Sequence, residues 1–278
     1  MKTRIVLIAA ALILIISVGF ILWHYTHLPK KKIVVREQAV VVKEAAKKSQ
    51  LPKIQKKYSN PKVVIVMDDF GYNMNNLDEL FAIKLPVTFS VLPNLPYSQK
   101  IARLASSNGY EIILHQPMEA NDKSAPQEAG TIKSGMNDKD VIALLEKSMS
   151  DVPGLSGISN HQGSKATEDK ALMMIVLKEL KKRKLFFFDS LVIQKSVCRD
   201  VAGALTVPYA KRDIFLDNTN SEDYIEKQVL ALRRFAFRKG SAIAVCHDKK
   251  ATITVLSKMM PQLAADGIVF TRLSEMVK

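Results

Sequence analysis

A regular alternation of short apolar runs with longer amphipathic stretches is the feature that most constrains this sequence. It begins near Lys62 and continues to the C-terminus. The short runs are rich in β-branched and aromatic residues and are nearly continuous in apolarity, which is typical of strands buried on both faces of a sheet. The longer stretches place apolar residues three and four positions apart, as amphipathic helices do. Strands and helices that alternate in this way are predicted to form a parallel sheet.

The alternation predicts an α/β fold of about seven or eight β/α units, whose parallel strands would fit a closed or nearly closed β/α barrel. An open, doubly wound sheet is the competing arrangement. The expected strands are residues 63–67, 87–91, 111–114, 155–158, 185–188, 214–216, 242–245 and 268–270. The expected helices are residues 75–83, 98–107, 138–149, 168–182, 221–238 and 252–265. The glycine-rich fingerprints of dinucleotide-binding and P-loop proteins do not occur, so nucleotide binding loses support.

The N-terminal residues have a different character. Residues 5–23 carry no charged side chain, and only Ser17 and Gly19 interrupt their apolar run. As a helix this run would be about 28 Å long, close to the thickness of a bilayer core. Because no small-residue cleavage motif follows it, an uncleaved transmembrane anchor is favoured over a cleaved signal segment, although both stay open.

Positive charge is concentrated in the same part of the chain. Residues 1–60 hold twelve Lys or Arg and two acidic residues, whereas the whole chain has a net charge of +14. We therefore expect an anchor or signal segment over 1–25, a basic flexible tether over 26–60 and a folded domain over 61–278. The tether is compatible with anionic lipid headgroups or with a solvated spacer. No nucleic acid is expected as a partner, because the folded part is nearly neutral and carries no familiar binding motif.

Acidic residues and histidines follow the predicted strands. Asp68 and Asp69 come after the first strand, and His115, His161 and His247 follow three later ones. The carboxyl ends of parallel strands meet at one edge or one end of such a fold. Three of the five histidines in the chain lie at predicted strand ends, so we expect them to share a site with the two aspartates.

These residue types suit metal-assisted hydrolysis. Two imidazoles and one carboxylate form a ligand set for a divalent metal and leave coordination positions open. A second carboxylate nearby can accept a proton from water. Asp68 and Asp69 could divide these roles, because successive side chains of a strand point in different directions. Taken alone, the Asp-Asp pair favours a helix N-cap with a turn over a catalytic pair; the Phe-Gly that follows it and the histidine motifs downstream strengthen the catalytic interpretation.

Six short segments occur in a characteristic order. They are 67–71 (MDDFG), 88–93 (TFSVLP), 114–119 (LHQPME), 160–164 (NHQGS), 188–190 (FDS) and 212–217 (RDIFLD). Together they resemble the divergent polysaccharide deacetylase family of bacteria, a branch of the carbohydrate esterases, from about Lys62 to the C-terminus. The resemblance implies a distorted β/α barrel and a metal-dependent hydrolase acting on N- or O-acetyl groups of a glycan.

The resemblance also implies roles for individual residues. Asp69, His115 and His161 would hold the metal, most often zinc, with Asp68 as the general base and His247 as the general acid that protonates the leaving amine. The further site residues that it implies are Arg212, which would hold a carboxylate, Asp189, which would orient a ligand histidine, and Glu119, Asn160 and Ser164, which would line the site.

Three positions depart from the family pattern. Gln162 stands where methionine is expected, Leu191 begins a pair where Arg-Thr is expected, and Asp248 follows the last histidine where proline is expected. All three leave the ligand candidates in place, so they bear on the substrate and on the role of His247 more than on metal binding. They also motivate an alternative, a catalytically vestigial module that binds glycans or assists envelope assembly.

The resemblance and the N-terminal segment together give an expected location. We expect a single-pass protein of the inner membrane whose catalytic domain lies in the periplasm and acts on an exported polysaccharide or a peptidoglycan-like glycan. If the segment is cleaved, the domain would be free in the periplasm. Cys198 and Cys246 could then pair in an oxidising compartment, or remain as free buried thiols.

Overall fold

The computed structural model describes residues 51–278. Within this range nine strands form one all-parallel sheet in the order β6-β5-β4-β3-β2-β1-β8-β7, with β9 paired to β1 beside this path. The strands are β1 (Lys62–Phe70), β2 (Thr88–Val91), β3 (Glu111–Met118), β4 (Gly157–Gln162), β5 (Phe186–Asp189), β6 (Tyr209–Lys211), β7 (Ile214–Phe215), β8 (Ser241–His247) and β9 (Val269–Phe270). The predicted parallel α/β fold is confirmed.

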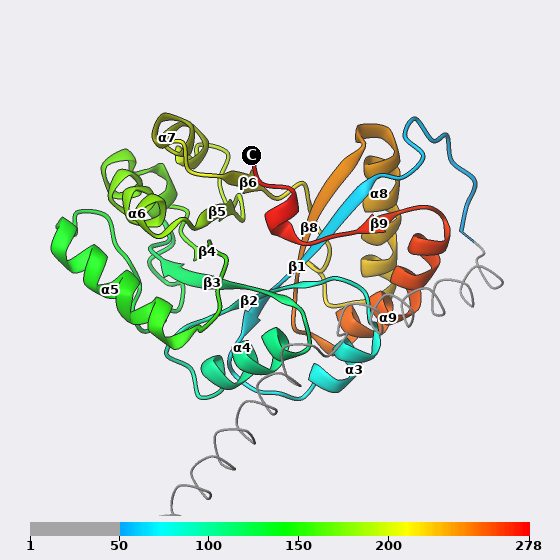
Figure 1. Ribbon diagram of the computed structural model, residues 1–278, viewed down its shortest axis with the longest axis horizontal. Helices are drawn as coiled ribbons and strands as arrows, with labels where there is room; N and C mark the ends of the chain where they lie inside the picture. Colours follow the sequence, from blue (N-terminus) through cyan, green and yellow to red (C-terminus); the bar gives the residue numbers. More distant parts are fainter. Residues whose placement is uncertain (1–50) are drawn as a thin grey trace, which may run out of the picture. The chain divides into compact units, whose positions relative to one another are not determined.

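Helices connect the strands and lie around the sheet (Figure 1). They are α3 (Leu77–Ala82), α4 (Ser98–Ser107), α5 (Asp138–Asp151), α6 (Lys170–Arg183), α7 (Cys198–Leu205), α8 (Glu222–Lys239) and α9 (Lys250–Ala265), with short 3-10 helices η1 (Ala166–Glu168) and η2 (Leu273–Glu275). Local capping explains several of their ends. Asn137 and Asp169 accept backbone N–H groups at the starts of α5 and α6, and Gly240 ends α8 with a φ of 88°.

The barrel is incomplete. Its edge strands β6 and β7 are consecutive in the chain, and only Arg212 and Asp213 lie between them. The Arg212 amide donates to the carbonyl of Asp189 in β5, whereas the Asp213 amide donates to the carbonyl of Ile243 in β8. No strand pairing joins β6 to β7 in the part of the chain that the structure describes. The predicted distorted barrel is therefore a curled parallel sheet whose edges approach each other without a shared ladder.

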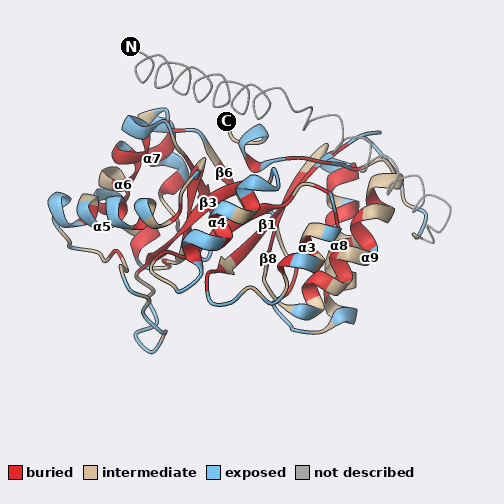
Figure 2. Ribbon diagram, turned by 60° about the horizontal axis from the view of Figure 1, so that its bottom comes forward, coloured by how far each residue is buried: buried red, intermediate tan, exposed pale blue. Residues whose placement is uncertain are grey.

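The two faces of the sheet bury different apolar clusters. In β1, Val63 and Ile65 pack against the helices, whereas Val64 and Val66 point into the barrel interior. This follows from the alternation of side chains along a strand. Figure 2 shows buried residues along the strands and on the helix faces turned toward them. Strands buried on both faces account for the nearly continuous apolar runs in the sequence.

The C-terminal segment closes the end of the interior where the strands begin. Leu273 is fully buried there, and its amide donates to Oε2 of Glu111, which is 2.7 Å away. Lys278 exchanges two backbone hydrogen bonds with Tyr209 in β6. The interior is thus closed at one end, and the carboxyl ends of the strands form its other end.

Some boundaries differ from the predictions. β3, β4 and β8 run two to four residues beyond their predicted ends, because the polar residues there continue the ladder pairing. Helix α7 and strand β6 were not predicted. Residues 51–60, assigned to the tether, contact the domain, since the amides of Lys57 and Tyr58 both donate to the carbonyl of Phe237.

The predicted anchor lies outside the described residues, as does the tether before residue 51. From residue 51 onward, every helix is too short or too polar to cross a bilayer.

Candidate metal and catalytic site

The site residues occupy inward-facing positions at or near the carboxyl ends of their strands. Asp68 lies two residues after Val66 in β1, and His115 lies two residues after Ile113 in β3. His247 ends β8, where its Cα pairs with that of Asp68. The side-chain alternation that fills the interior with apolar groups therefore places polar groups at its open end.

Asp69 reaches the same space through a change of backbone conformation. Its φ is +66°, and the pairing of β1 with β2 shifts register between Met67 and Phe70. Aspartate tolerates this left-handed region better than most residues. Gln162 and Leu191, next to site residues on β4 and β5, have φ values of 54° and 49°. Strained backbone of this kind concentrates at functional sites.

Asp69 brings two imidazoles together. Its Oδ1 lies 3.1 Å from Nδ1 of His161 and 3.4 Å from Nε2 of His115. One ligand atom from each of the three residues lies within 4.8 Å of the others. Ligands about 2.1 Å from a tetrahedral zinc ion are about 3.4 Å apart, so the separations suit a divalent cation.

The electrostatics of Asp69 agree with a cation site. Oδ1 is buried and makes no hydrogen bond of good geometry, although two imidazole nitrogens are near it. Burial raises the pKa of Asp69, but the neighbouring His115 and His161 outweigh this effect and hold the pKa far below its ordinary value. Asp69 is therefore a carboxylate with an unsatisfied oxygen, as a metal ligand requires.

Asp68 has a different environment. Its side chain is 5% exposed, and its Oδ2 lies 3.7 Å from Nε2 of His115. Its Oδ1 has no hydrogen-bond partner in the described structure. Burial raises the pKa of Asp68 above its ordinary value, in contrast to its neighbour Asp69. Two adjacent carboxyl groups with opposite pKa shifts are suited to separate roles.

His247 is held from behind by a buried carboxylate. Asp217 is fully buried, and its Oδ1 lies 3.0 Å from Nδ1 of His247. Its Oδ2 accepts hydrogen bonds from the His247 amide and from the Thr252 hydroxyl. Burial lowers the pKa of His247, but Asp217 outweighs it and raises the pKa above its ordinary value. Nε2 of His247 is left facing Asp69 Oδ2 at 3.6 Å.

A pair of buried serines supports His115. The Ser159 hydroxyl is 2.7 Å from Nδ1 of His115 and 2.9 Å from the Ser90 hydroxyl. This contact occupies Nδ1 and directs Nε2 toward Asp69. The contacts of Ser159 with His115 and of Asp217 with His247 were not predicted from the sequence. Ser159 lies two residues before His161 and therefore on the same face of the strand, which was the available signal for Ser159. Asp217 is the last residue of the RDIFLD segment.

Arg212 and Asp189 make contacts other than the expected ones. Arg212 was expected to hold a carboxylate, but its guanidinium donates to the carbonyls of Ser190 and Leu191. Asp189 was expected to orient a ligand histidine. It instead accepts hydrogen bonds from the Leu191 amide and from the hydroxyls of Ser196 and Tyr209. Both residues therefore brace the loop after β5, next to the site.

The three expected lining residues connect loops around the site. Glu119 lies 2.9 Å from Nζ of Lys165. The Asn160 side chain accepts the Ser190 amide, and the Ser164 hydroxyl accepts the Asn121 amide. Each contact joins the end of one strand to a loop after another, which fixes the shape of the open end. No disulfide links Cys198 and Cys246, which are both free and buried.

The comparisons with known proteins agree with this geometry. A family model described as divergent polysaccharide deacetylase matches residues 65–277. The Escherichia coli (strain K12) protein named "Uncharacterized protein YibQ" is 33% identical over 205 residues, which are 74% of this chain and 64% of that protein. The chain thus spans less than two thirds of this relative.

Solved structures share the fold. The uncharacterized protein ATU2773 of Agrobacterium tumefaciens C58 has a TM-score of 0.74 at 22% identity, covering 85% of this chain and 95% of that one. A peptidoglycan N-acetylglucosamine deacetylase domain of Eubacterium rectale ATCC 33656 has a TM-score of 0.51 at 15% identity, covering 80% and 92%. BA3943 of Bacillus anthracis, a CE4 family pseudoenzyme, has a TM-score of 0.51 at 12% identity, covering 80% and 67%.

Proposed function

The chain belongs to the divergent polysaccharide deacetylase family, and on this premise we propose that it hydrolyses acetyl groups from an envelope or exported polysaccharide. The observation that carries the proposal is the convergence of Asp69, His115 and His161, flanked by Asp68 and His247. This arrangement provides a ligand set, a base and an acid within one open end of the barrel.

Asp69, His115 and His161 would hold a divalent metal, and zinc has the matching preference for imidazole and carboxylate ligands. When bound, such an ion polarises a carbonyl group and makes a nearby water more acidic. The fit rests on the unsatisfied Asp69 Oδ1 and on the 3.1 and 3.4 Å separations around it.

The protein's own groups would transfer the protons of amide hydrolysis. The Asp68 carboxylate accepts a proton from the attacking water as the new C–O bond forms. The C–N bond then breaks, and the imidazolium of His247 gives its Nε2 proton to the leaving amine nitrogen. The products are acetate and a free amino sugar. Asp217 keeps His247 oriented and favours its charged form.

The substrate is proposed to be a glycan carrying N-acetyl groups, such as peptidoglycan or a related polymer. The named activity of the E. rectale domain is compatible with this class. The N-terminal apolar run supports attachment to the inner membrane with the domain in the periplasm, or release into the periplasm if the run is cleaved.

The test is acetate release from N-acetylglucosamine oligosaccharides and from peptidoglycan fragments by the zinc-loaded chain. Asp68→Asn should lower the rate about 10²–10⁴-fold, because it removes the base and keeps the shape. Glu226→Gln is the control, since the Glu226 carboxylate pairs with Lys258 between the outer helices α8 and α9, away from the ligand set. No acetate release from either substrate class would contradict the proposed activity.

A non-hydrolytic glycan-binding module is the second candidate. The departures at Gln162, Leu191 and Asp248, and the likeness in fold to a pseudoenzyme, favour it. It predicts saccharide binding without acetate release, with an affinity that Asp68→Asn leaves unchanged. Acetate release that is lost in Asp68→Asn would exclude it.

A further inference from the structure

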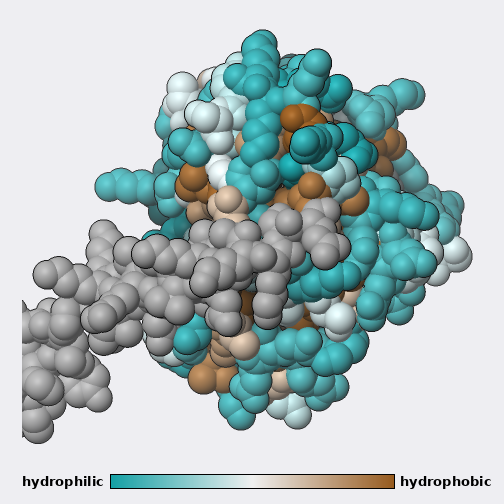
Figure 3. Space-filling view, turned by 90° about the vertical axis from the view of Figure 1, so that its right-hand side faces the viewer, coloured by the Kyte–Doolittle hydropathy of each residue, from teal (hydrophilic) through white to brown (hydrophobic). Residues whose placement is uncertain are grey.

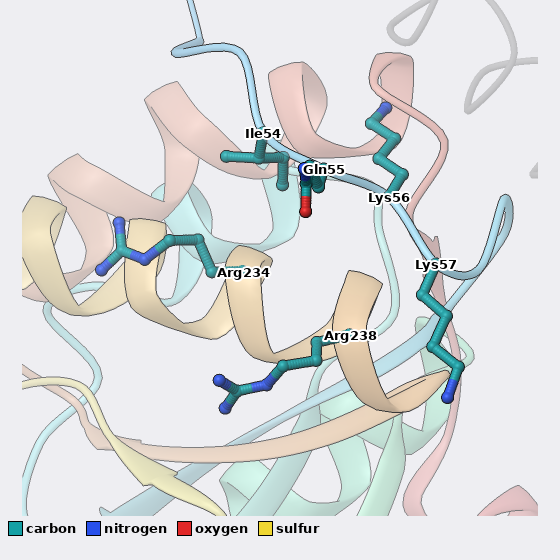
Figure 4. A pocket seen from close by; sticks show the side chains of 6 residues that line it. All are labelled: Ile54, Gln55, Lys56, Lys57, Arg234 and Arg238. Carbon is teal, nitrogen blue, oxygen red and sulfur yellow. The ribbon is translucent and has the colours of Figure 1, made fainter.

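An open hollow between residues 51–60 and helix α8 is lined by four cationic side chains. The lining residues are Ile54, Gln55, Lys56, Lys57, Arg234 and Arg238 (Figure 4). We call the four cations, Lys56, Lys57, Arg234 and Arg238, the basic face. All four are exposed, and the two arginines lie one helical turn apart on α8.

Most of this charge has no acidic partner among the described residues. Lys56 has an acidic partner, Asp266, whose Oδ1 lies 2.7 Å from its Nζ. Lys57 and Arg238 contact aromatic rings instead. From residue 51 to residue 278, no carboxylate forms an ion pair with Lys57, Arg234 or Arg238. The basic face therefore carries three positive charges that no carboxylate among residues 51–278 neutralises. Hydrophilic side chains prevail on the described part of the side of the domain that Figure 3 shows.

The basic face is fixed to the barrel. Arg233, which is 3% exposed, donates through Nε to Asp266 Oδ2 at 2.7 Å. Its Nη1 donates to the carbonyl of Pro52, also at 2.7 Å. These contacts, together with the amides that bond Phe237, hold residues 52–58 along α8. The charges thus keep one orientation relative to the rest of the domain.

This face lies toward the end of the barrel opposite the candidate site. Residues 51–60 lead into β1 at Lys62, and α8 ends at Lys239, just before β8 begins. Asp68 and His247 lie at the far ends of these two strands. Asp68 lies six positions after Lys62 along β1, a distance of about 20 Å.

We propose that the basic face docks on the anionic headgroups of a phospholipid bilayer and thereby turns the open end of the barrel away from the membrane. The proposal rests on the membrane attachment proposed above. Each cation close to an anionic lipid surface favours binding by about fivefold. Residues 24–50, which precede the described part of the chain, carry seven further Lys or Arg.

The orientation can be measured with the full chain in lipid nanodiscs. Both native cysteines are buried, so one introduced cysteine can carry a fluorophore. Gln55→Cys reports on the basic face, and Val192→Cys, which is exposed after β5, reports on the open end. Headgroup-labelled nitroxide lipid is the quencher, and discs with and without phosphatidylglycerol are compared.

In discs with phosphatidylglycerol, we expect quenching at position 55 to exceed that at position 192 by at least about twofold. The difference should shrink in high salt. The combined change Lys57→Gln, Arg234→Gln and Arg238→Gln should abolish the difference in quenching between positions 55 and 192. The matched control is Lys123→Gln, Lys139→Gln and Lys195→Gln, which removes the same charge from exposed residues around the open end and should leave it intact.

Two outcomes would overturn the proposal: equal quenching at the two positions in the anionic discs, or a difference that survives the change of the basic face. A chain that stays with the discs only when phosphatidylglycerol is present would contradict the proposed membrane anchor, but it would support docking of the basic face on anionic lipid. Acetate release in solution is measured separately, so the hydrolytic function is judged independently.

Discussion

Asp217 is a fully buried carboxylate whose contacts all serve to hold other groups. It binds both the amide and Nδ1 of His247, and it accepts the Thr252 hydroxyl. Asp217→Asn should therefore lower kcat about 10²–10³-fold with little change in KM, because the acid loses its orientation and its charge partner. Steady-state acetate release measures both constants.

Thr252→Val provides the comparison for this prediction. It removes one hydrogen bond from Asp217 but leaves both contacts with His247, so kcat should fall by less than about tenfold. Equal losses in the two variants would show that Asp217 acts on folding alone and not on His247.

At single residues, the sequence allowed the candidate ligand set to be predicted, because each of its residues follows a recognisable apolar strand. Asp69, His115 and His161 come together as expected. Ser159 and Asp217 lay in or next to segments that the sequence analysis singled out, but their partners were not assigned, because these depend on which strands are neighbours in the sheet. Arg212 and Asp189 make hydrogen bonds other than the expected ones, because the loop after β5 turns its carbonyls toward the arginine.

Gly157 determines how the barrel interior packs at β4. A methyl group at this position would overlap the Phe186 ring on the neighbouring strand β5. Gly157→Ala should lower the free energy of unfolding by about 1–3 kcal/mol through overpacking. Urea unfolding followed by circular dichroism measures the change.

Gly203→Ala is the matched control. Gly203 lies inside α7, and a methyl group there would meet no atom within 4 Å. Because alanine favours the helix over glycine, this variant should raise the free energy of unfolding by about 0.5–1 kcal/mol. A loss of stability at position 203 as large as at 157 would contradict this account of interior packing.

Among the elements, long periodic helices and apolar strands were predictable from the sequence. Helix α4 matches its predicted range, and α8 is displaced by one residue. Strand β6 was missed because its three residues carry no periodic signal. The full length of β3 and β4 was not predicted, because both strands end in polar residues. Such residues usually end a strand, but here they continue the pairing of β3 with β4 as far as the site.

At the scale of the whole domain, Asp266 connects residues 51–60 to the barrel. Its carboxylate binds both Arg233 and Lys56. Burial raises the pKa of Asp266, but these two cations outweigh it and lower the pKa below its ordinary value. Asp266→Asn should lower the free energy of unfolding at pH 7 by about 2–3 kcal/mol, because Arg233 is left buried without its charged partner.

The pH dependence of this effect has a definite sign. A lowered folded-state pKa stabilises the protein above the unfolded value, about 3.9 for aspartate. The difference between the wild type and Asp266→Asn should therefore shrink as the pH falls below about 4. Glu226→Gln, which breaks an exposed pair with Lys258, should change stability by less than about 1 kcal/mol. A difference at Asp266 that is independent of pH would contradict the ion-pair explanation.

The overall architecture was predictable from the alternation of strands and helices, but its closure was not. The gap between β6 and β7 arises because Arg212 and Asp213 bond to different neighbouring strands, which no local pattern encodes. The separation between the basic face and the site likewise depends on the direction in which α8 returns to the start of β8.

Metal content tests the central claim most directly. The wild-type chain, loaded with zinc and freed of excess by gel filtration, should retain about one ion per chain by mass spectrometry. Asp69→Asn, His115→Ala and His161→Ala should each retain far less, whereas Glu226→Gln should match the wild type. A wild type that retains no zinc, or ligand variants that retain as much zinc as the wild type, would contradict the proposed site.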